Sequence, residues 1–204
     1  VNLLRKNIIA RKTKNIAVIE QDILSLPLSF WRNLGKKFIA VGNIPYYLTG
    51  KLFRKIFELP QLPDRIVFMV QHEVAKRIVA LKPQANLLGS SIQAYGEPRL
   101  VKVIKKGNFW PKPKVDSAII LVKHISRERF RKMGLSEEYF FKVLKASFLH
   151  KRKILVNSLA KGLGWEKTKL AELLKKAHLP FSSRAQELNI EEFFRLAHLA
   201  KGFK

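Results

Sequence analysis

The stretch Phe38-Ile39-Ala40-Val41-Gly42-Asn43-Ile44-Pro45-Tyr46-Tyr47 decides how the rest of the chain is interpreted. A run of apolar and small residues stops at an amide, a proline and two aromatic rings. The length and branching of the run predict a buried strand, with Gly-Asn and Pro as its stop signals. Ligand sites in open α/β sheets lie at the carboxyl ends of strands, so we expect Asn43 and Tyr46 at such a site.

These residue types suit chemistry at the exocyclic amine of a base, whose lone pair is delocalised into the ring. Two fixed acceptors, the Asn43 side-chain oxygen and the Ile44 carbonyl, would bind the amine hydrogens and turn the lone pair outward. Tyr46 would stack on a base removed from its helix. Asn-x-Pro-Tyr is equally compatible with an ordinary turn after a core strand, so the residues alone leave both interpretations open.

Composition favours a folded protein with a polyanionic partner. The 204 residues include 40 Lys and Arg against 15 Asp and Glu, a formal net charge of +25, and 47% are hydrophobic. This length and apolar content predict one large domain or two modest ones rather than disorder. The charge favours nucleic acid ahead of an anionic membrane surface, and a merely solvated basic surface is the alternative.

Several classes are excluded or disfavoured. The chain has no cysteine, which excludes disulfides and thiolate metal sites and is compatible with a cytoplasmic protein. No metal-ligand cluster, signal peptide or apolar run near the ~20 residues of a membrane span is visible. We therefore expect no metal and no membrane partner.

The remaining secondary structure follows from periodicity and turn residues. We predict a helix within 1–14, a strand over 15–22, a helix over 48–57, a strand over 64–71 and a helix over 73–81. A loop over 82–89, a helix over 90–95 and antiparallel strands over 100–104 and 117–122 follow. After His124, apolar spacings near 3.6 predict helices within 136–160, 166–177 and 190–200, with Ser136 and Asn189 as caps.

Four stretches, in this order, carry a resemblance to a known family. Asn43-Ile44-Pro45-Tyr46 resembles the catalytic signature of S-adenosylmethionine-dependent RNA adenine-N6 methyltransferases. With residues 71–77, 109–118 and 152–159 it resembles the small-subunit (16S-type) ribosomal RNA adenine N6-dimethyltransferases over nearly the whole chain. The resemblance implies an α/β fold, with a Rossmann-like class I methyltransferase domain over 1–124 and a small all-helical RNA-binding domain over 125–204.

The resemblance also implies a reaction and a partner. A monomer in the cytoplasm would transfer methyl groups from S-adenosylmethionine to N6 of two adjacent adenines near the 3′ end of small-subunit rRNA. The product would be N6,N6-dimethyladenosine, and the partner the immature small ribosomal subunit.

Roles for individual residues follow from the same resemblance. Asn43, Ile44, Pro45 and Tyr46 would form the catalytic loop, and Phe109 would face the base opposite Tyr46. Phosphate contacts, which fix register without reading sequence, are expected from two lysines of the proline-stiffened loop and from a basic run in the helical part. A solvated helix face is the alternative for that run. The residues are Lys112, Lys114, His150, Lys151, Arg152 and Lys153.

The expected cofactor site is incomplete. The strand over 15–22 would end in Asp22, which by resemblance meets the adenine amine of the cofactor, with Ile23 and Asn43 beside it. An Asp that caps a turn is the alternative. Residues 1–21 contain no glycine, whereas this class holds its cofactor with a Gly-rich loop after the first strand. We therefore expect an N-terminally truncated domain without its first strands, which would leave this chain alone inactive.

Two other functions stay open. The large-subunit rRNA methyltransferases of the macrolide-resistance type share Asn-x-Pro-Tyr, but the basic helical tail with Asn157-Ser158-Leu159 argues against them. A non-catalytic RNA-binding ribosome-assembly factor is favoured by the missing Gly-rich loop.

Overall fold

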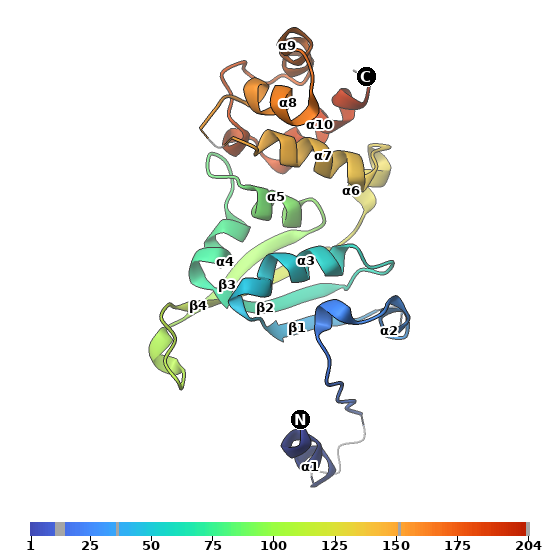
Figure 1. Ribbon diagram of the computed structural model, residues 1–204, viewed down its shortest axis with the longest axis vertical. Helices are drawn as coiled ribbons and strands as arrows, with labels where there is room; N and C mark the ends of the chain where they lie inside the picture. The colour runs from blue at the N-terminus through green and yellow to red at the C-terminus, as the bar shows by residue number, and fades with distance from the viewer. Residues whose placement is uncertain (11–14, 36, 151, 203–204) are drawn as a thin grey trace.

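The computed structural model describes residues 1–10, 15–35, 37–150 and 152–202. Its centre is a four-stranded sheet of order β1-β2-β4-β3 (Figure 1). Strand β1 pairs in parallel with β2, and β4 pairs antiparallel with both β2 and β3. The strands are β1 (Ile39–Asn43), β2 (Arg65–Gln71), β3 (Glu97–Ile104) and β4 (Ser117–Lys123). The structure confirms the predicted antiparallel strands over 100–104 and 117–122, which are β3 and β4, and the predicted strand over 64–71, which is β2.

The register brings functionally interesting residues to one end of the sheet. Asn43, the last residue of β1, lies opposite Met69 near the end of β2. Ser117, the first residue of β4, lies opposite both Gln71 and Ile104. The carboxyl ends of β1, β2 and β3 and the start of β4 therefore share one edge.

One face of the sheet is covered by α3 (Thr49–Phe57), α4 (His72–Val79) and α5 (Leu87–Gln93) (Figure 1). Alternate residues of β2 point into this core: Ile66, Phe68 and Val70 are at most 2% exposed. The prediction that β1 is buried is wrong, because Val41 is 74% exposed. Strand β1 is an edge strand that pairs only with β2, so its outward-facing side chains have no covering layer among the described residues.

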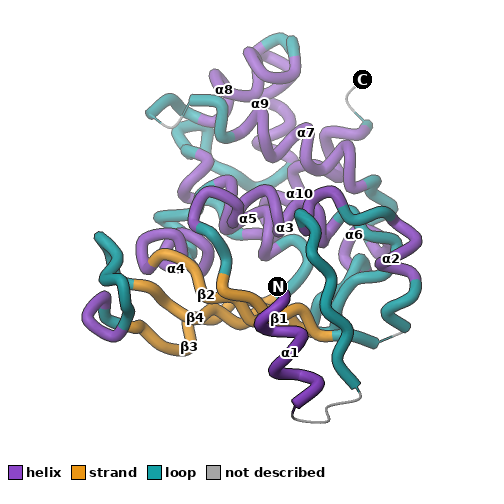
Figure 2. Tube along the Cα trace, turned by 60° about the horizontal axis from the view of Figure 1, so that its bottom comes forward, coloured by secondary structure: helices purple, strands orange, loops and turns teal. Residues whose placement is uncertain are grey.

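The N-terminal segment differs from expectation. Helix α1 (Asn2–Ala10) confirms the predicted helix and lies apart from the sheet (Figures 1 and 2). Residues 15–22 form no strand, so that prediction is wrong. Residues 16–19 form a short apolar run typical of a strand, but no described strand lies beside them to complete a hydrogen-bonded ladder. A short turn η1 (Ile23–Ser25) and α2 (Leu28–Arg32) follow.

Predicted boundaries shift at two other places. Helix α5 begins at Leu87 because the Asn86 side chain accepts a hydrogen bond from Gly89 N, so the predicted loop over 82–89 is too long. The predicted helical region over 136–160 is divided into two helices, α7 (Glu137–Ser147) and α8 (Leu155–Leu163). The two helices pack against each other, so the chain must reverse between them.

After β4 the described chain is helical. The remaining elements are α6 (Glu128–Lys132), α7, α8, α9 (Lys167–Lys176), η4 (Ala185–Glu187) and α10 (Ile190–Lys201). The predicted caps are confirmed, since Ser136 accepts from Tyr139 N and Asn189 from Glu192 N. No helix of the described residues has the length and apolar character needed to cross a bilayer.

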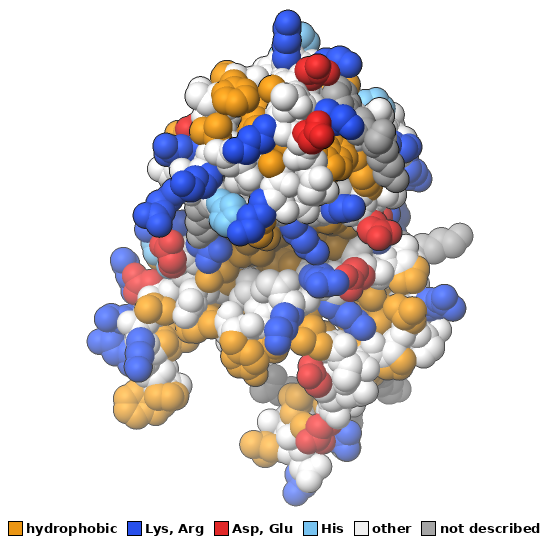
Figure 3. All heavy atoms as spheres, turned by 45° about the horizontal axis from the view of Figure 1, so that its top comes forward, with side chains coloured by type: hydrophobic (Ala, Val, Ile, Leu, Met, Phe, Trp, Pro, Cys, Tyr) orange, Lys and Arg blue, Asp and Glu red, His pale blue; other side chains and the backbone are white. Residues whose placement is uncertain are grey.

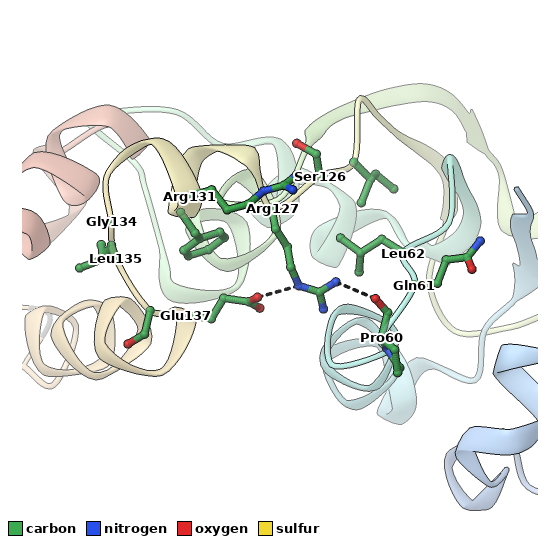
Figure 4. Close-up of a pocket in the computed structure, with 12 residues that line it drawn as sticks. Pro60, Gln61, Leu62, Ser126, Arg127, Arg131, Gly134, Leu135 and Glu137 are labelled. Carbon is green, nitrogen blue, oxygen red and sulfur yellow. Dashed lines mark hydrogen bonds and ion pairs between the residues drawn. The ribbon is translucent and has the colours of Figure 1, made fainter. Parts of the chain in front are cut away.

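Arg127 joins the helical part to the sheet part (Figure 4). Its guanidinium lies 2.6 Å from Glu137 Oε1, and the other Glu137 oxygen accepts the hydroxyl of Tyr95. Burial, and then this hydrogen bond, raise the pKa of Tyr95. The same guanidinium donates to three carbonyls at the end of α3, those of Phe57 at 2.7 Å, Leu59 at 2.8 Å and Pro60 at 3.3 Å. Arg127 therefore supplies donors that the helix terminus lacks.

Candidate active site

The Asn43–Tyr46 loop is held at its backbone while its acceptors stay open. Ile44 N donates to Met69 O at 3.1 Å, which extends the pairing of β1 past its last residue, and Leu48 N closes the next turn onto Pro45 O at 2.9 Å. The Ile44 side chain is buried, which anchors the loop. The Ile44 carbonyl accepts no backbone hydrogen bond from the described residues. The Asn43 side chain is exposed and likewise free of partners there.

Tyr46 is half-buried at the start of η2 (Tyr46–Leu48). Its hydroxyl shares a 3.1 Å hydrogen bond with Ser117 Oγ, and Ser117 is 2% exposed at the start of β4. This bond connects the Asn43–Tyr46 loop to the second segment of the expected site.

Phe109 lies on the loop between β3 and β4, directly after η3 (Lys106–Asn108). It is half-buried, while Trp110 is 96% exposed and therefore does not cover the end of the sheet. Lys112 and Lys114 are exposed on the same loop. Both loops thus leave the same edge of the sheet, although no ring contact joins Tyr46 to Phe109 in the described chain.

Asp116, at the end of this loop, forms hydrogen bonds with residues at the start of the loop. One carboxylate oxygen accepts from Lys106 N at 2.9 Å and the other from Lys105 Nζ at 3.1 Å. The backbone carbonyl of Asp116 accepts from His72 N at 3.0 Å. The hydrogen bond from Lys106 N, and then that from Lys105, lower the pKa of Asp116 below its ordinary value.

A hollow of about 500 Å³ lies between the N-terminal segment and β1. Gln21 and Ile23 line one side, and Asn43 with Ile44 and Pro45 lines the other. Asp22 does not line it. Its side chain accepts from Leu24 N at 2.9 Å and so caps η1, which is the turn-capping arrangement given above as the alternative.

The hollow fits a ligand with an apolar, flat part. Most of its lining is apolar, its size lies within the range of small-molecule sites, and the Asn43 amide is available at its rim. The buried indole nitrogen of Trp31, which also lines it, has no hydrogen-bond partner among the described residues. At Gly42 a Cβ would lie 2.6 Å from Ile44 Cδ1, so glycine there preserves the local packing. These residues suit the adenosine part of S-adenosylmethionine.

The basic run of the helical part lies in the connection between α7 and α8 rather than on a helix. His150 is half-buried, and its carbonyl accepts from Lys153 N. Arg152 and Lys153 are exposed, and Lys151 lies outside the described residues. Figure 3 shows further Lys and Arg side chains over the helical part, with fewer acidic side chains between them.

Sequence reasoning missed two polar partners of the site. Ser117 and Asp116 belong to the stretch 109–118 that carried the family resemblance, but neither was assigned a role. Their position directly after the lysine-rich loop, at the first residues of a strand, was the available signal. The Ser117 bond to Tyr46 and the Asp116 bond to His72 also require β4 to lie beside β2, and the sequence does not display that pairing.

The fold is of the Rossmann-like class, and two solved structures share it. A dimethyladenosine transferase from Plasmodium falciparum superposes with a TM-score of 0.78 at 20% identity, over 96% of this chain and 76% of that one. The 23S rRNA methyltransferase ErmE superposes with a TM-score of 0.68 at 19% identity, over 98% and 77%.

The family itself is shown by sequence. The family described as "Ribosomal RNA adenine dimethylase" matches residues 1–201, and the chain belongs to it. "Ribosomal RNA small subunit methyltransferase A" of Fusobacterium nucleatum is 36% identical over 202 residues, 98% of this chain and 74% of that protein. The protein of the same name from a Dehalococcoides mccartyi strain is 40% identical over 182 residues, 89% of this chain and 62% of that protein.

Proposed function

We propose that this chain acts in N6,N6-dimethylation of two adjacent adenines near the 3′ end of small-subunit rRNA. We also propose a methyltransferase domain over 1–124, an RNA-binding domain over 125–204, and action as a cytoplasmic monomer on the immature small subunit. Family membership supports the methyltransferase class. The observation that carries the proposal is the pair of open acceptors, Asn43 and the Ile44 carbonyl, on a loop whose backbone is fixed beside a ligand-sized hollow.

In this proposal the chain's residues orient the reacting amine. The Asn43 side-chain oxygen and the Ile44 carbonyl accept the two amine hydrogens, which turns the nitrogen lone pair outward. Pro45 stiffens the turn, and Tyr46 and Phe109 hold the base ring from its two sides. Orientation and fixed dipoles supply the rate enhancement, because no general base is needed once the new N–C bond makes the amine acidic.

S-adenosylmethionine, when bound, supplies the methyl group on a sulfonium that leaves as a thioether. Ile23 and Asn43 would hold it within the hollow. Asp22, whose side chain caps η1 and does not line the hollow, is assigned to its adenine amine by the family resemblance alone. Lys112, Lys114, His150, Lys151, Arg152 and Lys153 would contact RNA phosphates, consistent with the net charge of +25.

The test compares Asn43→Ala with the unaltered sequence in methyl transfer from labelled S-adenosylmethionine to isolated, unmethylated small subunits. Each is joined to the part of the Fusobacterium nucleatum relative that this chain does not cover, because residues 1–21 contain no Gly-rich cofactor loop. We expect the variant to lose transfer by at least about a hundredfold, because it removes one of the two groups that aim the amine. RNA affinity should stay within about twofold, since phosphate contacts dominate affinity. Near-normal turnover of Asn43→Ala would show that the proposed site is wrong.

The same assay separates the alternatives. Transfer to isolated large subunits instead would identify the macrolide-resistance type of enzyme. The absence of transfer to either subunit by the extended protein, together with no calorimetric signal on its titration with S-adenosylmethionine, would leave a non-catalytic RNA-binding role.

A further inference from the structure

We infer that the dipeptide Asp116–Ser117 positions both sides of the base clamp, Tyr46 on one side and Phe109 on the other. This inference rests on the proposed function. The two residues make no contact with the acceptor loop's amide and carbonyl, so their role is to position the rings rather than to react.

Ser117 fixes the direction of the Tyr46 ring. Its backbone is held in the interior strand β4 between Gln71 and Ile104, and its side chain is 2% exposed, so Oγ has little freedom to move. The 3.1 Å bond to Tyr46 Oη lies at the far end of the ring axis. A restraint at that end limits rotation about the Cα–Cβ bond, and therefore fixes where the ring lies relative to a base.

Asp116 fixes the turn from which Phe109 leaves. Its carboxylate holds Lys106 N at the start of η3 and Lys105 Nζ just before it, while its carbonyl holds His72 N at the start of α4. Charge-assisted hydrogen bonds of this kind are stronger than neutral ones. The loop over 105–116 is thus closed at its base, and Phe109 is the first residue after the anchored turn.

The two restraints are linked because their anchoring residues are neighbours in the chain. Asp116 and Ser117 are consecutive, so the anchors of the two rings are one residue apart at the start of β4. The distance between the anchors is therefore fixed by the chain itself rather than by either loop alone.

The experiment uses an RNA hairpin from the 3′ end of small-subunit rRNA with 2-aminopurine in place of one of the adjacent adenines. Stacking on aromatic rings quenches this fluorophore, so the quench reports the clamp, while anisotropy of the same RNA reports affinity. Neither measurement requires the cofactor. The variants are Ser117→Ala, Tyr46→Phe, their combination, and Asp116→Ala. The control is Ser147→Ala, which also removes a buried serine hydrogen bond, in this case the bond to Val143 O within α7.

We expect Tyr46→Phe and Ser117→Ala each to lower the ratio of stacked to unstacked base about fivefold, which corresponds to ~1 kcal/mol for one neutral hydrogen bond. The double variant should lose no more than either single one, because both remove the same bond. Asp116→Ala should lower the quench as well, and Ser147→Ala should leave it unchanged. Affinity should stay within about twofold throughout.

Two failures are distinguishable. If the unaltered chain binds the hairpin without quenching, the aromatic clamp of the proposed function is wrong and the inference falls with it. If the unaltered chain quenches and Tyr46→Phe quenches equally well, the clamp stands and the positioning role is refuted. Tyr46→Phe removes only a hydroxyl, so it decides the matter even if Ser117→Ala does not fold.

Discussion

Replacement of the half-buried Arg127 by Ala should lower the stability of the protein by weakening the contact between the helical part and the sheet part. The variant removes the partner of Glu137 and three hydrogen bonds to carbonyls at the end of α3. The side chains of Arg127 and Glu137 are 26% and 32% exposed, so water replaces the lost donors only in part.

The magnitude follows from this partial burial. Loss of one partner of a fully buried pair costs about 3–5 kcal/mol, and a hydrogen bond to a charged group about 1.5–3 kcal/mol. We expect a loss of about 2–3 kcal/mol in the free energy of unfolding. For a chain of this length that corresponds to a fall in Tm of roughly 4–12 °C.

The assay is urea and thermal unfolding followed by circular dichroism, with Arg54→Ala as the control. Arg54 pairs with Glu58 at 2.7 Å on the same helix, but the two side chains are 74% and 57% exposed. Its loss should cost under about 0.5 kcal/mol. Equal effects of the two substitutions would refute the reasoning that Arg127 caps α3 across the joint.

Two further predictions concern packing and pH. Gly162→Ala should destabilise by about 1–3 kcal/mol, because its Cβ would lie 2.5 Å from Ala146 Cβ, whereas Gly50→Ala, with nothing within 4 Å, should stabilise by about 0.5–1 kcal/mol. Opposite shifts of the urea midpoint check this, and shifts of the same sign contradict it. Because burial first, and then Glu137, raise the pKa of Tyr95 above its ordinary 10.0, the stability it contributes is complete below that pH. It is lost as pH rises toward the folded-state pKa, since only the unfolded chain then releases the proton. Urea midpoints measured from neutral pH to about pH 11 should fall less steeply in Tyr95→Phe, and equal slopes would contradict the assignment.

Local patterns predicted the parts of the fold that local forces determine. The amphipathic spacing of α3 and the continuous apolar run of β2 were sufficient because each element buries apolar side chains against its neighbours. Residues 15–22 show the limit. Their short apolar run suits a strand, but a strand also needs a partner, and partner choice is a tertiary property.

The candidate site divides in the same way. The position of Asn43 at the end of β1, with the Ile44 carbonyl next to it, followed from a short stretch of sequence. Exposure of Val41 did not, because it depends on which strand lies at the sheet edge. The Tyr46–Ser117 bond was equally hidden, since it joins residues 71 positions apart.

The strand order has a consequence for the assembly of the chain during synthesis. Strand β4 is the last of the four in sequence, yet it occupies an interior place between β2 and β3. Until the ribosome has released β4, the β1–β2 pair and β3 have no strand to connect them, and Tyr46 has no anchor. Domains fold as units once their segments are available. The Asn43–Tyr46 loop therefore gains its hydrogen bond to Ser117 only when β4 inserts. A nascent chain that stalls before β4 would therefore carry the acceptor loop without a positioned ring.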